Sequence, residues 1–277
     1  MNDRKKYKEN FIKEKNMKKS LLIVLSLMLT LLAVGVAIAG LAPGTGITDS
    51  YHDLGTTAAS YGDAAEQGGQ NRICVYCHAP HNTIKLGSAA AVDGMGNPVQ
   101  YLPLWNHTIT TMPGFDMYNN GPLEPTDAQH MSTAKAIATQ PQGVSILCLS
   151  CHDGSVATNA YGTGTGAVGA ADKFMTGRAL IGGVNGAGLG DLSNHHPVSF
   201  SYTQVEAVDN EIRPAATTPM GNGFNGPKNI IDFLYGADNM VECSTCHEVH
   251  NGPEVAGVRL TYVDDTRSAF CLTCHLK

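Results

Sequence analysis

The chain has 277 residues, with 18 Lys and Arg against 24 Asp and Glu, and it combines 31 glycines with only 6% aromatic residues. Residues 1–19 hold eight of the basic and three of the acidic residues, so the remainder carries ten against 21, a net charge of about −11. A surface with this excess of negative charge repels polyanions and excludes nucleic acid as a partner.

The N-terminus has the organisation of an export signal. Met17, Lys18 and Lys19 form a positive region, residues 20–39 are apolar without a charge, and Ala37-Ile38-Ala39 is a small-x-small site. We therefore predict a signal peptide over residues 1–39, with Met17 as an alternative start and cleavage before Gly40. The apolar run of about 19 residues is also long enough to be an uncleaved membrane anchor. Its small residues favour cleavage, which leaves no membrane-spanning segment.

All eight cysteines lie in four pentapeptides of the form Cys-x-x-Cys-His. They are Cys74-Val-Tyr-Cys77-His78, Cys148-Leu-Ser-Cys151-His152, Cys243-Ser-Thr-Cys246-His247 and Cys271-Leu-Thr-Cys274-His275. This spacing is typical of c-type haem attachment, in which the two thiols form thioethers and the histidine reaches the iron. The sequence therefore predicts four covalent haems, each with its pentapeptide histidine as the proximal iron ligand.

Other uses of Cys-x-x-Cys explain less of this pattern. A thioredoxin-like redox pair, a zinc site and a disulfide framework all use such cysteines, but none requires a histidine directly after the second one. Four haems leave roughly 60 residues for each, too few to enclose every haem in a domain of ordinary size. We predict a single multihaem cytochrome c domain over residues 40–277, mostly irregular, with a few short helices and minimal strand wrapped around the haems.

Few regular elements are predicted between the motifs. Residues 127–139, after Thr126 as a helix cap, have the best helical character, and residues 198–202 alternate as a short strand does. Residues 157–191 form a Gly-rich stretch without a phosphate-binding motif, which we predict to be a surface loop. The first cysteines of successive motifs are 74, 95 and 28 residues apart, so the motifs do not build a solenoid.

The distal iron ligand decides whether a haem binds substrate or only passes electrons. The 11 histidines exceed the eight needed for bis-histidine ligation of four irons, although seven methionines outside the leader could compete. Histidines three residues after a proximal ligand cannot return to the same iron, because three residues span at most about 11 Å. His81 and His250 are therefore expected to ligate other haems. Five candidates compete for four distal positions, with His130 and His195 expected at the surface: His81, His196, His250, His52 and His107.

The chain resembles a known group, the secreted tetrahaem cytochromes of metal-reducing bacteria that polymerise into extracellular nanowires. The resemblance covers most of the mature chain and is carried by the four haem motifs, Tyr51-His52-Asp53-Leu54, His81-Asn82, Leu104-Trp105-Asn106-His107, His196-Pro197-Val-Ser-Phe and His250-Asn251. It implies bis-histidine ligation, a continuous stack of haems and electron export beyond the outer membrane. It also implies that His81 ligates a haem of the adjacent subunit, and it ranks His107 below His52 as a ligand.

The leading functional interpretation is electron transfer without substrate chemistry, so the protein is not expected to be an enzyme. Its partners would be further copies of itself, other redox cytochromes or extracellular acceptors, at the cell surface or outside the cell. Alternatives are a monomeric periplasmic electron shuttle and a fibre whose redox activity is incidental. A multihaem reductase of a small oxyanion such as nitrite is less favoured, because it needs an iron with an open position and the histidines are in excess.

The first prediction concerns the mature protein. Cleavage before Gly40 and four complete attachment motifs predict a chain of residues 40–277 carrying four covalent haems. The intact mass of the purified protein should equal that chain plus four haem masses. A mass with three haems or fewer would contradict the count.

Overall fold

The computed structural model describes residues 42–48, 50–54, 72–118, 140–162, 172–182, 189–223, 226–257 and 259–276, together with Met17 and Lys19. The chain divides into two units, residues 1–42 and 43–277, and the second contains all four Cys-x-x-Cys-His motifs. Apart from Met17 and Lys19, the predicted signal peptide lies outside the described residues. The predicted helix at 127–139 with His130 lies outside them as well. Within the described ranges, no helix is long and apolar enough to cross a membrane.

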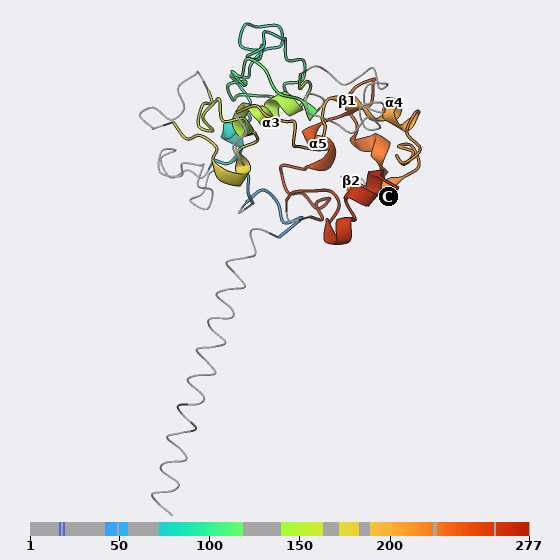
Figure 1. The fold of residues 1–277 in the computed structure, drawn as a ribbon. Helices are drawn as coiled ribbons and strands as arrows, with labels where there is room; N and C mark the ends of the chain where they lie inside the picture. The colour runs from blue at the N-terminus through green and yellow to red at the C-terminus, as the bar shows by residue number, and fades with distance from the viewer. Residues whose placement is uncertain are drawn as a thin grey trace, which may run out of the picture. The chain divides into compact units, whose positions relative to one another are not determined.

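The second unit consists mainly of loops with short helices and small sheets (Figure 1). The longest helix in the part of the chain that is described has eight residues. In chain order the elements are η2 (Cys74–Tyr76), α3 (Ser145–His152), η4 (Gly177–Ala179), β1 (Phe200–Ser201), α4 (Tyr202–Glu206), β2 (Pro219–Gly223), β3 (Gly226–Asn229), η5 (Ile230–Phe233), β4 (Met240–Val241), α5 (Cys243–Cys246), η6 (Thr266–Ser268) and α6 (Cys271–Cys274).

Two small antiparallel sheets tie the C-terminal half together. β1 pairs with β4, Phe200 opposite Val241, and β2 pairs with β3 in a register that shifts between Pro219 and Gly221. The strand expected at residues 198–202 is present but short, because α4 begins at Tyr202, where the Ser201 hydroxyl accepts a hydrogen bond from the Gln204 amide. Such side-chain capping by serine ends the extended backbone and starts a helix.

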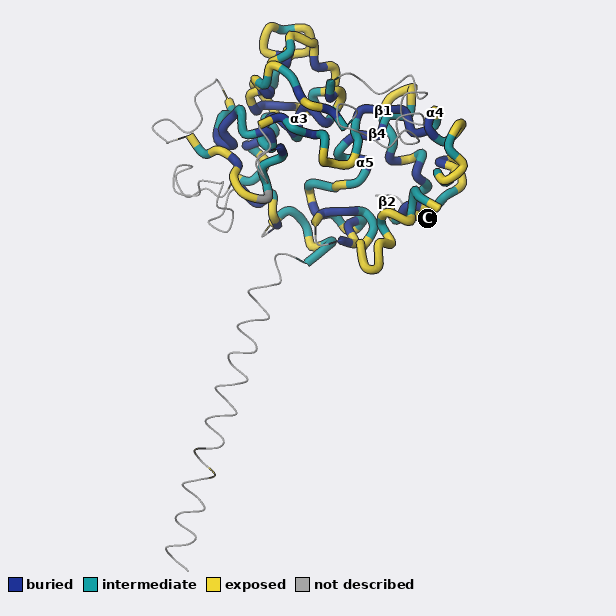
Figure 2. Tube along the Cα trace, viewed as in Figure 1, coloured by how far each residue is buried: buried dark blue, intermediate teal, exposed yellow. Residues whose placement is uncertain are grey.

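In the described part of the chain, apolar side chains gather in three small clusters rather than in one core. The first surrounds Trp105, and the second surrounds Phe115. The third, around Ile230, joins β1, α4, η5 and β4. Helix α3 links the first two clusters and is buried along most of its length (Figure 2), since Ile146 packs in one cluster and Leu149 in the other.

The Gly-rich stretch begins inside the protein rather than at its surface. Ala157, Thr158 and Asn159 are all buried. The Thr158 amide and hydroxyl both donate to the Lys173 carbonyl, at 2.7 and 3.0 Å, and the Lys173 amide donates to the Asn159 side chain. These hydrogen bonds satisfy the buried polar groups. The start of the stretch and its described middle part, residues 172–182, therefore pack together beside the second motif.

Candidate cofactor-binding site

Each Cys-x-x-Cys-His motif forms a helical turn. The first motif begins η2, the second ends α3, the third forms α5 and the fourth forms α6. In three motifs the histidine amide donates to the carbonyl of the first cysteine, at 2.8 Å for His78, 3.1 Å for His247 and 3.0 Å for His275. Residues three and four apart share one face of a helical turn. The turn therefore places both thiols and the following histidine along one side of the chain, as attachment to one flat ring requires.

Several of the motif thiols lie in apolar surroundings that disfavour their charged form, whereas contact with Cys148 lowers the pKa of Cys243. Burial raises the pKa of Cys77 to about 11 and of Cys246 to about 12, and it raises the pKa of Cys151 as well. Catalytic and metal-ligating cysteines need a stable thiolate and sit where the pKa is lowered. An uncharged thioether suits the same apolar surroundings, because it has no charge to desolvate.

Backbone carbonyls orient the imidazoles of three of the proposed proximal histidines. Nδ1 of His78 lies 2.7 Å from the Pro103 oxygen, Nδ1 of His152 lies 2.7 Å from the Ala179 oxygen, and Nδ1 of His247 lies 3.0 Å from the Arg259 oxygen. A carbonyl accepts only from the N–H form of Nδ1. The contact thus fixes the tautomer and leaves the Nε2 lone pair for a metal, as at known metal-binding histidines.

His52 faces the proximal histidine of the second motif. Its ring centre lies 6.0 Å from that of His152, with 61° between the ring planes. A metal-bound imidazole nitrogen lies about 2 Å from the metal and about 1 Å from its ring centre, so imidazoles on opposite sides of one iron have centres about 6 Å apart. Nδ1 of His52 is buried without a hydrogen-bond partner, and burial, followed by repulsion from His152, lowers its pKa to about 3. The ring is therefore neutral and fits a ligand role.

His250 forms the same kind of pair with the first motif. Its ring centre lies 6.3 Å from that of His78, with 21° between the planes. Nδ1 of His250 donates to a carboxylate oxygen of Glu248 at 2.8 Å. Carboxylates commonly orient metal-binding histidines in this way. His250 thus lies opposite a histidine of another motif, the arrangement that the span argument requires.

His107 is placed differently from these four histidines. It is fully buried, and both ring nitrogens contact backbone carbonyls, Nδ1 to Thr108 at 2.7 Å and Nε2 to Ala157 at 2.9 Å. The Nε2 atom also lies 3.4 Å from the Cys151 sulfur. Neither nitrogen is therefore free to bind a metal in this arrangement. The ring instead links the loop after Trp105 to the segment that follows α3.

The other two distal candidates lie at the surface. His196 is exposed, and its Nδ1 is 2.9 Å from the Pro197 oxygen. His81 is also exposed, with no side-chain partner among the described residues. The structure brings neither of them opposite a proximal histidine within unit 43–277. His195 is exposed, as expected.

Consecutive Cys-x-x-Cys-His motifs are linked through shared packing or close approach. Cys77 of the first packs against the same apolar cluster as Ile146 of α3. Cys148 of the second lies close to Cys243 of the third, where α3 packs against α5. The third and fourth motifs are both linked to the cluster around Ile230. The Tyr262 amide donates to the Cys246 carbonyl, and Tyr262 and Cys274 both pack against this cluster.

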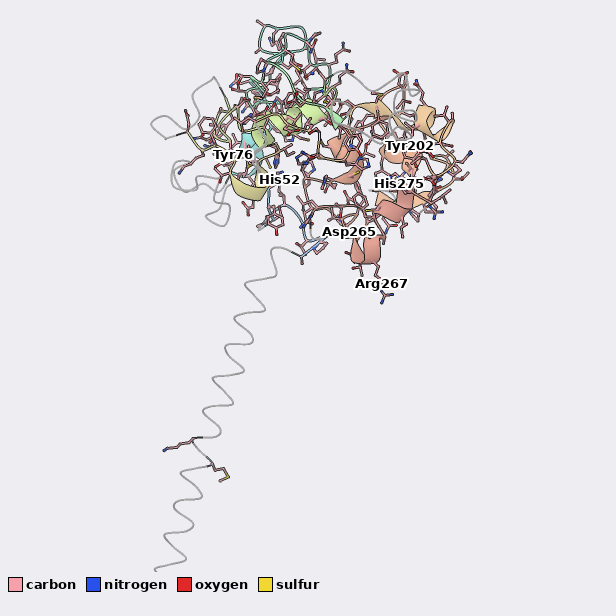
Figure 3. The ribbon with its side chains drawn as sticks, viewed as in Figure 1. His52, Tyr76, Tyr202, Asp265, Arg267 and His275 are labelled. Atoms are coloured by element: carbon pink, nitrogen blue, oxygen red, sulfur yellow. The ribbon has the colours of Figure 1, made fainter. Side chains whose placement is uncertain are left out.

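The fourth motif is held by the loop after α4. The Arg213 amide donates to the Cys274 carbonyl at 2.8 Å, and the Tyr202 hydroxyl donates to the Arg213 carbonyl at 2.9 Å. Figure 3 labels Tyr202 and His275 in this region, and His52 with Tyr76 in the region of the first two motifs. The four motifs thus share supporting segments.

Within the described ranges no group of three or more His, Cys, Asp or Glu side chains is placed to hold a bare metal ion. A haem iron takes only two protein ligands, since the porphyrin supplies the other four, so the imidazole pairs are the relevant arrangement. No protein-family model matches the chain, and comparison with curated proteins likewise finds no match.

Sequence reasoning did not single out Glu242, which precedes the third motif. Its side chain is only 2% exposed and accepts hydrogen bonds from the hydroxyls of Ser145 and Ser199. The Ser145 hydroxyl also accepts from the Cys243 amide at 3.0 Å. The carboxyl group therefore lies where the attachment helices α3 and α5 meet. Nothing in the local sequence indicates this burial, which depends on residues about 40 and 100 positions away.

Burial raises the pKa of Glu242 to about 7 from its usual 4.5, more than the two serine hydrogen bonds lower it. The folded protein then holds a proton that the unfolded chain releases between pH 4.5 and 7. The free energy of unfolding should fall as the pH rises through this window, by at most about 3 kcal/mol. Urea unfolding followed by Trp105 fluorescence should show this fall, and Glu242→Gln should remove it. The exposed Glu211→Gln variant should behave as the unchanged protein, and equal slopes in all three would contradict the assignment.

Proposed function

We propose that this chain is an electron-transfer protein that carries four c-type haems. The observation that carries the proposal is the pairing of imidazoles at the separation that two ligands of one iron require, next to helical turns that present paired thiols. The eight motif cysteines would hold the haems, and His78, His152, His247 and His275 would bind the irons. Bound haem would supply a reversible one-electron couple between ferric and ferrous iron.

The distances support two distal assignments. His52 pairs with His152, and His250 pairs with His78. Of the five candidates for four distal positions, His107 is the one left without an iron, because both of its ring nitrogens contact backbone carbonyl oxygens. His81 and His196 remain for the third and fourth motifs. If histidines supply both protein ligands of every iron, no iron would be left open for a substrate, which favours electron transfer over reduction of an oxyanion.

The proposal extends to assembly and location. His81 cannot reach the iron of His78 along three residues, and it is exposed with no side-chain partner in the described part of the chain. An exposed imidazole on a haem motif suits a ligand for a second copy of the chain. Together with the resemblance to nanowire cytochromes and the predicted leader, this supports a homopolymer outside the cell that passes electrons to other redox proteins or extracellular acceptors.

The distal assignment is tested by the same substitution at two histidines. Glutamine is a poor iron ligand but offers a donor and an acceptor. We expect all four irons to be low-spin in the unchanged protein, one of the four to become high-spin in His52→Gln, and none in His107→Gln. Electron paramagnetic resonance of the purified holoprotein at neutral pH measures this. A high-spin iron in the unchanged protein would contradict the electron-transfer proposal, and one caused by His107→Gln would reverse the assignment.

Assembly is tested separately by His81→Ala. We expect this variant to retain four haems, to lose or shorten its filaments and to contain one high-spin iron per subunit. Electron microscopy and the same resonance spectra provide the readouts. His195→Ala removes another exposed histidine and should leave filaments intact. Normal filaments with only low-spin iron in His81→Ala would show that His81 is not a ligand between subunits.

A further inference from the structure

The residue after His250 joins two parts of the chain that lie about 200 positions apart. Asn251 is only 1% exposed. Its Oδ1 accepts from the Gly44 amide at 2.9 Å, and its Nδ2 donates to the Thr45 hydroxyl at 3.2 Å and the Gly46 carbonyl at 3.0 Å. Its own carbonyl accepts from the Gly46 amide at 2.7 Å. The side chain and backbone carbonyl of Asn251 thus form hydrogen bonds with each of residues 44–46.

The geometry on both sides of this contact is specific. Asn251 has φ +52°, a left-handed conformation that asparagine tolerates better than most residues. Gly44 has φ +74° and lies so close to the facing turn that an added Cβ would be 3.3 Å from the Val255 carbonyl oxygen. Glycine meets both requirements without strain. Larger residues at position 44 would push the segment away from Asn251.

Glu248 fixes the turn that carries Asn251. Its carboxylate accepts from the His250 amide at 3.0 Å, from His250 Nδ1 at 2.8 Å and from the Gly252 amide at 2.8 Å. The Asn251 amide donates to the Glu248 carbonyl at 3.3 Å. The imidazole of His250 and the side chain of Asn251 are therefore held by one small hydrogen-bonded turn, residues 248–252.

The segment bound by Asn251 leads directly to His52. The Ser50 amide donates to the Ile47 carbonyl at 3.0 Å, and the His52 amide lies 3.2 Å from the Ser50 hydroxyl. Asp53 and Leu54, which follow, are buried. The described residues between the Asn251 contact at 44–46 and His52 thus form a tight, hydrogen-bonded turn. Displacement of residues 44–46 would move His52 away from His152.

We propose that Asn251 is a positioning residue that clamps residues 44–46 and thereby holds His52 opposite His152. The turn at 248–252 then places the distal imidazoles of two motifs at once, His250 directly and His52 through the clamp. This inference rests on the proposed function, since His52 acts as a distal ligand there. It explains how a histidine on a loop far from its partner in sequence is kept in position without a regular element beneath it.

The test compares two asparagines with the same backbone conformation. Asn239 also has φ +52°, but among the described residues its side-chain amide bonds only to the Thr203 hydroxyl, at 3.4 Å. Glycine at either position keeps the backbone relaxed and removes the amide. We expect Asn251→Gly holoprotein to retain four haems with one iron in four high-spin, and added imidazole to restore the low-spin spectrum. Asn239→Gly should remain low-spin throughout.

Hydrogen exchange gives a readout that is independent of iron ligation. Amides of residues 43–54 should exchange faster in Asn251→Gly than in the unchanged protein, while those of α3 should not change. If Asn251→Gly does not yield a four-haem protein, Asn251→Asp serves instead, because it keeps the acceptor for Gly44 and loses both donors. Unchanged spectra and exchange in these variants, or an equal effect of Asn239→Gly, would overturn the clamp. A high-spin iron in the unchanged protein would contradict the proposed function alone, and exchange would still decide the clamp.

Discussion

The helical turn at each Cys-x-x-Cys-His motif is the constraint on which the rest of the structure depends. It sets two thiols three residues apart on one face and directs the following imidazole beside them. Because the turn is short and stops at the histidine, every motif needs support from elsewhere. In each case a backbone group from another segment supplies it, as the Asn106 amide does for Cys77 and the Ile181 amide for His152.

This dependence explains why so little regular structure is present. A segment that orients an imidazole does so with a backbone carbonyl oxygen, and such oxygens are most available where no helix or sheet already uses them. Pro103, Ala179 and Arg259 all contribute such oxygens from loops or the end of a short helix. The apolar clusters are correspondingly small and lie between motifs, where they fix the spacing of neighbouring helices. Strands of two to five residues complete the links.

Long-range hydrogen bonds also connect the two ends of unit 43–277. Asn251 binds the segment before His52, while His250 beside it faces the first motif. Glu242 connects the start of α3 to the start of α5 through Ser145. Both residues lie near the third motif in sequence, yet both support the second. Glu242 contacts the start of α3, which ends in the second motif, and Asn251 contacts the segment before His52, which faces that motif. The proposed electron-transfer site therefore depends on contacts between motifs as much as on the motifs themselves.

The sequence alone predicted covalent haem attachment, because the spacing of Cys74, Cys77 and His78 is local and requires only one helical turn. It also indicated a loop-rich chain and excluded His250 as a ligand within its own motif, since chain length limits reach. It could not choose among the five distal candidates, because that choice depends on which loops meet in space. Only the tertiary structure placed His52 against His152 and gave both nitrogens of His107 to backbone carbonyls. The burial of Glu242 and the contacts of Asn251 were equally invisible in the sequence, since both arise from segments far apart along the chain.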